Sequence, residues 1–191
     1  MRDPRRVAIL ISGRGSNMRA LVEQARGYRV VLVASNRPDA EGLAWARSHG
    51  LPTWCWQSKS VPREAFDAAV SKALDDHRVG TVALAGYMRI LSPAFVDAWR
   101  GRIVNIHPSL LPKYRGLDTH ARALEAGDSV AGCSVHLVTE ELDAGEVLGA
   151  AEVPVKPGDT PARLEERVRA AEHRLYPRVL AEFVSRRSLR A

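Results

Sequence analysis

Asn105 and His107 are the residues whose types and spacing point most directly to chemistry. They end a short apolar run that is typical of a buried strand, and residues two apart in a strand project from the same face. An amide donor and an imidazolium that converge on one atom can stabilise the oxyanion formed when an amine attacks a carbonyl. The pair therefore predicts acyl transfer, although the spacing alone also fits a structural histidine.

Asp143 is the third candidate, in the acidic turn Glu140-Glu141-Leu142-Asp143-Ala144-Gly145. The turn follows a predicted strand and can bring Asp143 against His107. There the carboxylate would favour the protonated imidazolium. Alternatively, it could position a water that carries a proton to the leaving group, or His107 could act as a neutral base. These roles stay open.

The glycine loop Gly13-Arg14-Gly15-Ser16-Asn17 stands between the first predicted strand and the first predicted helix. Backbone N–H groups and the helix dipole favour an anion at such a place. Met18 occupies the third position of a GxGxxG motif, and the loop lacks the Gly-Lys-Ser/Thr of a P-loop. The loop therefore predicts a site for one phosphomonoester, with a simple connecting turn as the alternative.

Other kinds of site have little support in the sequence. No Gly-x-Ser-x-Gly motif occurs, and we interpret Cys55 and Cys133 as small core residues. The histidines show none of the usual zinc spacings, so a zinc site built from His107, His120 and His136 is not expected.

The surrounding chain alternates between strands and helices. Strands are predicted over residues 7–11, 28–34, 53–56, 81–85, 103–106, 134–138 and 147–155. Helices are predicted over residues 18–26, 41–49, 63–77 and 121–126, and Ser92-Pro93 and Thr160-Pro161 open two more. This order predicts an α/β fold, a single doubly wound, mostly parallel sheet flanked by helices, with ligands at the carboxyl ends of the strands.

The composition limits the class of protein. The chain has 191 residues, of which 46% are hydrophobic and 26% charged, so one globular domain over residues 1–191 is expected. Its net charge of +6 favours anionic ligands, but the basic residues are dispersed, and we interpret Arg186, Arg187 and Arg190 as a solvated tail. We expect a cytoplasmic protein with no nucleic-acid or membrane partner.

The chain resembles the phosphoribosylglycinamide formyltransferase family, folate-dependent enzymes of purine synthesis, over nearly its whole length. The resemblance rests on five motifs in order: residues 11–17, 84–93, 105–112, 134–136 and 142–145. It implies a formyltransferase-like, Rossmann-type fold. It also implies that 10-formyltetrahydrofolate, as co-substrate, gives its formyl group to the amine of 5-phosphoribosylglycinamide without a metal.

The resemblance assigns roles to individual residues. It implies that Asn105, His107 and Asp143 are catalytic, and that the acceptor is bound by Gly15, Ser16, Asn17 and Glu172. Glu172 would contact the ribose hydroxyls, whereas its surroundings in the sequence favour a solvated helix charge. The implied folate side comprises Arg63, near the glutamate of folate, and Met88, Arg89, Ile90, Leu91, Asn105, Thr139, Glu140, Glu141, Leu142 and Asp143.

Five residues depart from the family pattern: Arg14, Arg115, Asp118, Glu146 and Ala150. Asp118 puts in doubt a second histidine near the acceptor, and Glu146 and Ala150 are expected to alter the folate side. The alternatives are formyltetrahydrofolate hydrolase, another folate-dependent formyltransferase such as the methionyl-tRNA enzyme, or a binding module without catalysis. The extra domains of the first two are not expected in 191 residues. A monomer and a homodimer are both compatible with the sequence.

Overall fold

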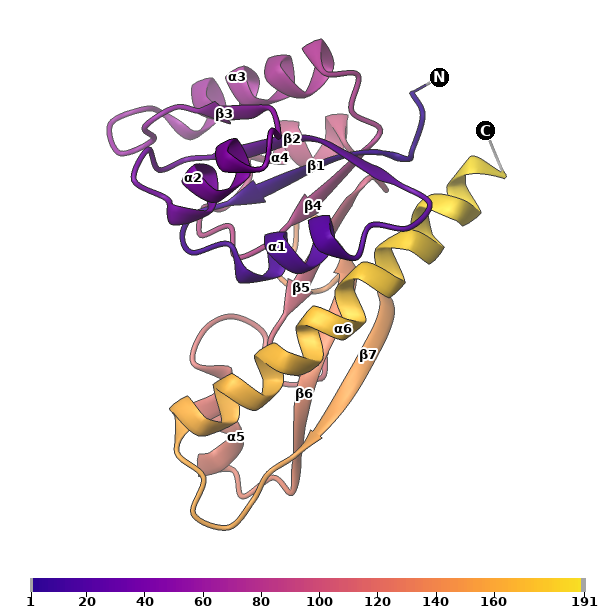
Figure 1. Cartoon of the computed structure of the whole chain (residues 1–191). Coiled ribbons are helices and arrows are strands. Elements are labelled where there is room, and N and C mark those ends of the chain that lie inside the picture. The colour runs from indigo at the N-terminus through magenta and orange to yellow at the C-terminus, as the bar shows by residue number, and fades with distance from the viewer. Residues whose placement is uncertain (1, 190–191) are drawn as a thin grey trace.

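The computed structural model describes residues 2–189. Its strands are β1 (Arg6–Ile11), β2 (Arg29–Ser35), β3 (Thr53–Cys55), β4 (Thr81–Leu84), β5 (Ile103–His107), β6 (Val130–Leu137) and β7 (Val147–Pro154). Its helices are α1 (Ser16–Glu23), α2 (Glu41–Ser48), α3 (Arg63–Asp76), α4 (Pro93–Ala98), α5 (Thr119–Glu125) and α6 (Pro161–Ser188). The strands form one sheet in the order β3-β2-β1-β4-β5-β6-β7 (Figure 1).

The sheet confirms the predicted doubly wound, mostly parallel architecture. Strands β1 to β5 pair in parallel, whereas β6 runs antiparallel to β5 and β7 antiparallel to β6. The strand order reverses at β1, because β2 lies on one side of it and β4 on the other. Ligands of such sheets bind outside the carboxyl ends of the strands at this switch point. Here those ends lead into the glycine loop and into residues 85–92.

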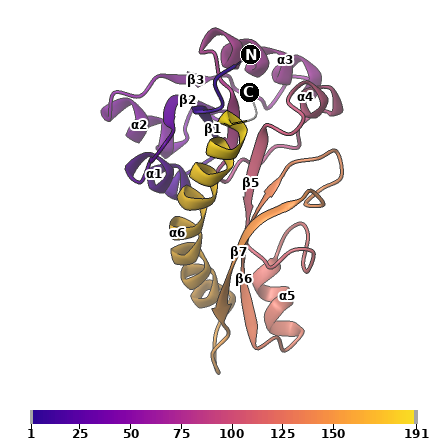
Figure 2. The ribbon, with the colours of Figure 1, turned by 90° about the vertical axis from the view of Figure 1, so that its right-hand side faces the viewer.

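Alternate side chains of β1 divide the core into two layers. Val7 and Ile9 pack with side chains of α1, α2 and α6 on one face of the sheet. Ala8 and Leu10 pack with side chains of α3 and α4 on the other. Figures 1 and 2 show the long α6 beside α1 and then along β6 and β7. Cys133 is fully buried in the first layer of the core, as expected. Cys55 is half-buried and packs against the same layer.

The predicted elements differ from the observed ones mainly at their ends. Helix α1 begins at Ser16, two residues before the predicted start, and Gly15 caps it with a left-handed φ of 74°. The prediction begins at Met18 because the apolar pattern begins there. Strand β6 begins at Val130, four residues before the predicted start, because Val130 is exposed and Gly132 interrupts the apolar pattern, although Gly132 and Cys133 are buried. The predicted caps are confirmed, because Ser92 Oγ accepts from the N–H of Phe95 at 3.2 Å and Thr160 Oγ1 from that of Arg163 at 3.3 Å.

The prediction of a solvated basic tail is confirmed for Arg186, which is exposed, and is wrong for Arg187, which is half-buried. Arg186 and Arg187 belong to the last turns of α6. The Arg187 guanidinium lies 5.6 Å from the centre of the Phe183 ring and donates to the backbone oxygen of Gly101 at 3.0 Å. Arg190 lies outside the described residues. Packing of α6 against the sheet therefore continues where the sequence shows only charge.

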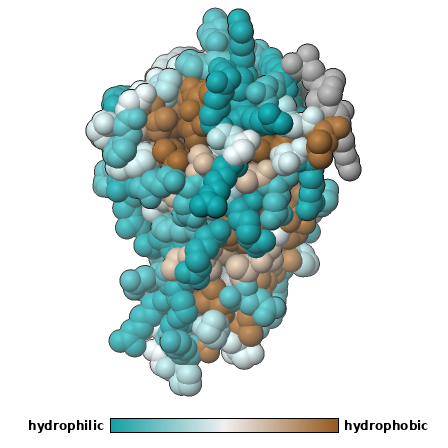
Figure 3. All heavy atoms as spheres, turned by 45° about the vertical axis from the view of Figure 1, so that its right-hand side comes forward, coloured by the Kyte–Doolittle hydropathy of each residue, from teal (hydrophilic) through white to brown (hydrophobic). Residues whose placement is uncertain are grey.

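The surface drawn in Figure 3 is mostly hydrophilic, with hydrophobic atoms gathered in separate patches. Among the helices of residues 2–189, none combines the length and the apolar character that crossing a membrane requires.

Candidate active site

A cavity of about 990 Å³ opens where the carboxyl ends of β1, β4 and β5 meet. Its walls come from the glycine loop, residues 84–91, the end of β5, the loop before α5, the turn after β6, and one face of α6. The cavity thus occupies the position that the strand order predicts for a ligand.

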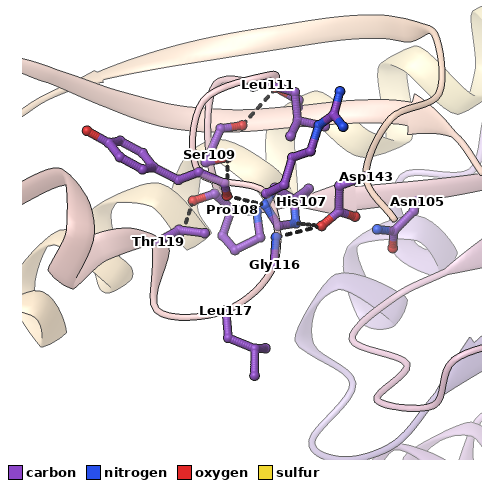
Figure 4. A network of polar contacts seen from close by, with 12 residues as sticks. Asn105, His107, Pro108, Ser109, Leu111, Gly116, Leu117, Thr119 and Asp143 are labelled. Atoms are coloured by element: carbon purple, nitrogen blue, oxygen red, sulfur yellow. Dashed lines mark hydrogen bonds and ion pairs between the residues drawn. The ribbon is translucent and has the colours of Figure 1, made fainter. Parts of the chain in front are cut away.

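His107 and Asp143 are in contact in the wall of this cavity. His107 Nδ1 lies 3.3 Å from Asp143 Oδ2, and both side chains are less than a tenth exposed. His107 Nε2 lies 3.0 Å from the backbone oxygen of Tyr114. The Tyr114 oxygen only accepts, so Nε2 donates to it, and the carboxylate beside Nδ1 forms an ion pair with the ring when the ring is protonated. Figure 4 shows the Asp143 carboxylate between His107 and Asn105.

Asn105 is oriented by His136, which lies directly opposite it in the antiparallel register of β5 and β6. Asn105 Nδ2 is 3.2 Å from His136 Nε2, and His136 Nδ1 is 2.8 Å from the backbone oxygen of Leu137. Because that oxygen only accepts, Nδ1 carries the proton and Nε2 accepts from the amide. Burial lowers the pKa of His136 and so favours this neutral ring. One amide hydrogen of Asn105 remains for a ligand.

Glu172 on α6 faces the same cavity and is 7% exposed. Its Oε2 accepts from Asn17 Nδ2 at 2.8 Å, and burial raises its pKa. One turn later the hydroxyl of Tyr176 lies 3.0 Å from the backbone oxygen of Leu84 and 2.9 Å from that of Val104, which fixes α6 on the sheet. The interpretation of Glu172 as a solvated helix charge is therefore wrong.

Comparison with known proteins identifies the family. The family model described as formyl transferase matches residues 5–180. The chain belongs to the formyl transferase family. It is 45% identical over 186 residues to the phosphoribosylglycinamide formyltransferase of Escherichia coli (strain K12), covering 95% of this chain and 88% of that protein. The crystal structure of phosphoribosylglycinamide formyltransferase from Brucella melitensis matches with a TM-score of 0.89 and 48% identity, covering 97% of both chains.

Longer relatives contain the same domain. The chain is 46% identical over 188 residues to the trifunctional purine biosynthetic protein adenosine-3 of Drosophila melanogaster. The match covers 95% of this chain but only 14% of that protein. These matches confirm the resemblance and the fold that the sequence indicated.

The cavity of this formyl transferase brings together most of the residues predicted for the site. They are Asn17, Arg63, Met88, Arg89, Ile90, Leu91, Asn105, His107, Thr139, Glu140, Leu142, Asp143 and Glu172. Three predicted residues lie outside its lining. Gly15 caps α1, Ser16 lines a smaller adjoining pocket, and the Glu141 carboxylate pairs with Arg115 at 2.6 Å on the surface. Glu141 is thus paired at the surface beside the cavity, and its contact with folate stays a prediction.

Sequence reasoning missed the cavity residues on the first turns of α6. Glu165 and Arg169 form an ion pair and both line the cavity, on the same helix face as Glu172. Arg169 and Arg14 also line the adjoining pocket of about 190 Å³. Glu165, Arg169 and Glu172 are four and then three residues apart, which places their side chains on one face of a helix. This spacing was the signal in the sequence that could have indicated them.

The residues that depart from the family pattern fall in different places. Arg14 and Asp118 line the cavity, and His120 lines it two residues after Asp118, so a histidine is still present on this wall. Burial lowers the pKa of His120. Glu146 and Ala150 are not among the lining residues, so neither contacts a ligand in the cavity directly. Within residues 2–189, no three metal-ligating side chains are grouped as a metal site would require.

The rim of the cavity is apolar. Met88, Ile90, Leu117 and Leu142 all line it, and their exposed fractions lie between 60% and 71%. Figure 4 shows Leu117 projecting away from the polar network around His107. Exposed apolar side chains gathered at one opening are typical of a ligand-binding surface. The cavity therefore combines an apolar rim with a buried polar wall.

Proposed function

We propose that this enzyme transfers the formyl group of 10-formyltetrahydrofolate to the amine of 5-phosphoribosylglycinamide. The products are formylglycinamide ribonucleotide and tetrahydrofolate. The observation that carries the proposal is the placement of Asn105, His107 and Asp143 in one cavity wall. Two small-molecule substrates, a cytoplasmic location, and a monomer or homodimer without nucleic-acid or membrane partners accompany this function.

Asn105 and His107 stabilise the transition state in this proposal. The acceptor amine attacks the formyl carbon, a carbon–nitrogen bond forms, and the formyl oxygen becomes an oxyanion. The second amide hydrogen of Asn105 is donated to that oxygen, and the imidazolium of His107 supplies positive charge beside it. The carboxylate of Asp143 lies 3.3 Å from His107 and pairs with that charge.

A proton must also move during the transfer. The attacking nitrogen loses one proton, and N10 of the folate gains one as its bond to the formyl carbon breaks. Asp143 lines the cavity wall, and its carboxylate can also orient a water. That water would carry the proton from the attacking amine to N10 of the folate. Because Oδ2 of Asp143 accepts from the backbone N–H of Gly116 at 2.9 Å, the carboxylate is held in place throughout.

The acceptor is assigned to the part of the cavity formed by the glycine loop and α6. Gly15, Ser16 and Asn17 start α1 and offer backbone N–H groups to the phosphate. Arg14 and Arg169 add guanidinium groups at the junction of the two pockets. Glu172 accepts from the ribose hydroxyls, and its Oε2 also accepts from the side-chain amide of Asn17.

The folate is assigned to the apolar rim and the wall next to it. Met88, Ile90 and Leu142 offer apolar surface to its rings. Arg89, Leu91, Thr139 and Glu140 complete this side, and Arg63, which lines the cavity at the start of α3, is assigned to the glutamate of the folate.

The decisive experiment follows absorbance on mixing the enzyme with 10-formyltetrahydrofolate, with and without phosphoribosylglycinamide. Tetrahydrofolate formation that requires the acceptor supports the transferase. Its formation without any acceptor would indicate a hydrolase, and its formation only when methionyl-tRNA replaces the small acceptor would indicate the tRNA enzyme. No reaction in any mixture contradicts the proposal.

A further inference from the structure

The segment between β4 and α4, residues 85–92, forms part of the cavity wall without being a helix or a strand. Its position depends on side chains from distant parts of the chain. The backbone N–H of Met88 donates to Ser12 Oγ at 2.8 Å. The backbone N–H of Ser92 donates to Asp67 Oδ2 at 2.6 Å. Two buried side chains thus anchor the segment, one near its middle and one at its end.

Asp67 is a buried carboxylate on α3 that the proposed reaction does not use. It is 2% exposed, next to the fully buried Phe66. Burial raises its pKa, while the bonds from Ser92 and the charges of Arg89 and Arg63 act in the opposite direction. An ionised carboxylate is costly in such surroundings unless it is bonded and paired. Both arginines that compensate it line the cavity.

Arg89 ties the same segment to the loop before α3. Its guanidinium lies 4.8 Å from the centre of the Phe66 ring and donates to the backbone oxygens of Val61 at 3.2 Å and Ser58 at 3.4 Å. Its side chain is therefore committed to holding the segment, although the residue also lines the cavity. Asp67 and Arg89 act on the segment from one side, that of α3.

The polar groups around Asp67 do not form a closed structural network. Within residues 2–189, Asp67 Oδ1, Arg89 Nε and the hydroxyl of Tyr87 are buried without a hydrogen-bond partner. Burial, and to a smaller extent the charge of Asp67, raise the pKa of Tyr87. Buried polar groups without a partner are costly, so each of these three calls for an explanation.

We propose that Asp67 is a positioning residue for folate binding. Through the N–H of Ser92, Asp67 fixes the end of the segment and so holds residues 88–91 at the cavity wall before the folate arrives. Asp67 itself touches neither substrate. The inference rests on the proposed assignment of this wall to the folate, and it adds a residue to which no role in the reaction has been given.

The test compares Asp67→Ala, Asp67→Asn and Asp76→Asn. Alanine removes both the acceptor and the charge, so KM for 10-formyltetrahydrofolate should rise about 10-fold or more, while KM for the acceptor and kcat stay near wild type. Asparagine keeps an acceptor for Ser92, so a smaller rise of about 5-fold is expected. Asp76, exposed on the same helix and paired with Lys72, is the matched control and should change nothing.

Calorimetry with tetrahydrofolate and with phosphoribosylglycinamide separates positioning from general destabilisation. A purely structural role would lower the number of binding sites for both ligands alike and leave their affinities unchanged, and this outcome overturns the proposal. Unchanged tetrahydrofolate affinity in Asp67→Asn also overturns the proposal. This test remains decisive if Asp67→Ala does not fold. If the wild-type enzyme itself fails to bind tetrahydrofolate, the proposed function falls first, so the two failures are distinguishable.

Discussion

The Nδ1 atom of His107 lies 3.3 Å from Oδ2 of Asp143, and the two side chains are 7% and 8% exposed. The residues are far apart in the sequence and are joined by the turn that follows β6. A carboxylate this deeply buried requires compensation. It receives that compensation from His107 and from the backbone N–H of Gly116. Asp143 therefore connects the imidazole of His107 to Gly116, in the loop before α5.

Replacing Asp143 should reduce turnover rather than binding. In Asp143→Asn, kcat is expected to fall about 100-fold or more, because a positioned proton-transfer group contributes that much. Both KM values should stay within about 3-fold, since the asparagine oxygen can still accept from Gly116. Steady-state kinetics with each substrate varied tests this. Asp97→Asn, an exposed change at a residue paired with Arg100, is the control.

Two roles are proposed for Asp143: it pairs with the imidazolium of His107, 3.3 Å away, and it orients a water for proton transfer. A variant with near-normal turnover would exclude both roles.

Asn105 and His136 should behave as one unit. Asn105→Ala is expected to lower kcat about 100- to 1000-fold, the usual cost of removing an oxyanion donor. His136→Phe keeps the amide but removes its acceptor, so kcat should fall about 10-fold. The double variant should be little slower than Asn105→Ala alone, because the main contact of His136 Nε2 is with the amide of Asn105, and Asp143 Oδ1 is farther away at 3.6 Å. Full additivity of the two losses in a double-mutant cycle would contradict this arrangement.

The sequence predicted those parts of the site that lie within one element. Asn105 and His107 follow from the two-residue period of β5, and the acidic turn indicated Asp143. His136 could not be assigned to Asn105, because their pairing depends on β6 running antiparallel to β5. Glu172 was interpreted wrongly from its charged neighbours, since its burial depends on the docking of α6 against α1 and the sheet. The ion pair between Glu141 and Arg115 could not be predicted either, because spacing does not reveal a contact between two distant loops.

Arg169 should contribute to acceptor binding alone. In Arg169→Gln, KM for phosphoribosylglycinamide is expected to rise about 10-fold through loss of a charged hydrogen bond to the phosphate. KM for 10-formyltetrahydrofolate should not change. Arg174→Gln makes the same charge change at an exposed position of the same helix and should leave both values unaltered. Inhibition by inorganic phosphate gives a second measure, and an unchanged inhibition constant in Arg169→Gln would argue against a phosphate contact.

Glu172 is expected to lower stability while it promotes acceptor binding. Burial raises its pKa in the folded protein above the ordinary value of about 4.3. The folded state therefore binds this proton more tightly than the unfolded state, so the contribution of Glu172 to stability falls as pH rises through the folded pKa. The amide introduced by Glu172→Gln does not titrate, and it can still accept from Asn17. The unfolding free energy of Glu172→Gln should accordingly match wild type near pH 4 and exceed it increasingly towards pH 7.

The same variant should raise KM for the acceptor about 10-fold, since the charged acceptor for the ribose hydroxyls is lost. Urea unfolding between pH 4 and 8, together with steady-state kinetics, measures both effects. Glu166→Gln, exposed on the same helix, should produce neither. Greater stability without any loss of acceptor affinity would place Glu172 outside the acceptor site.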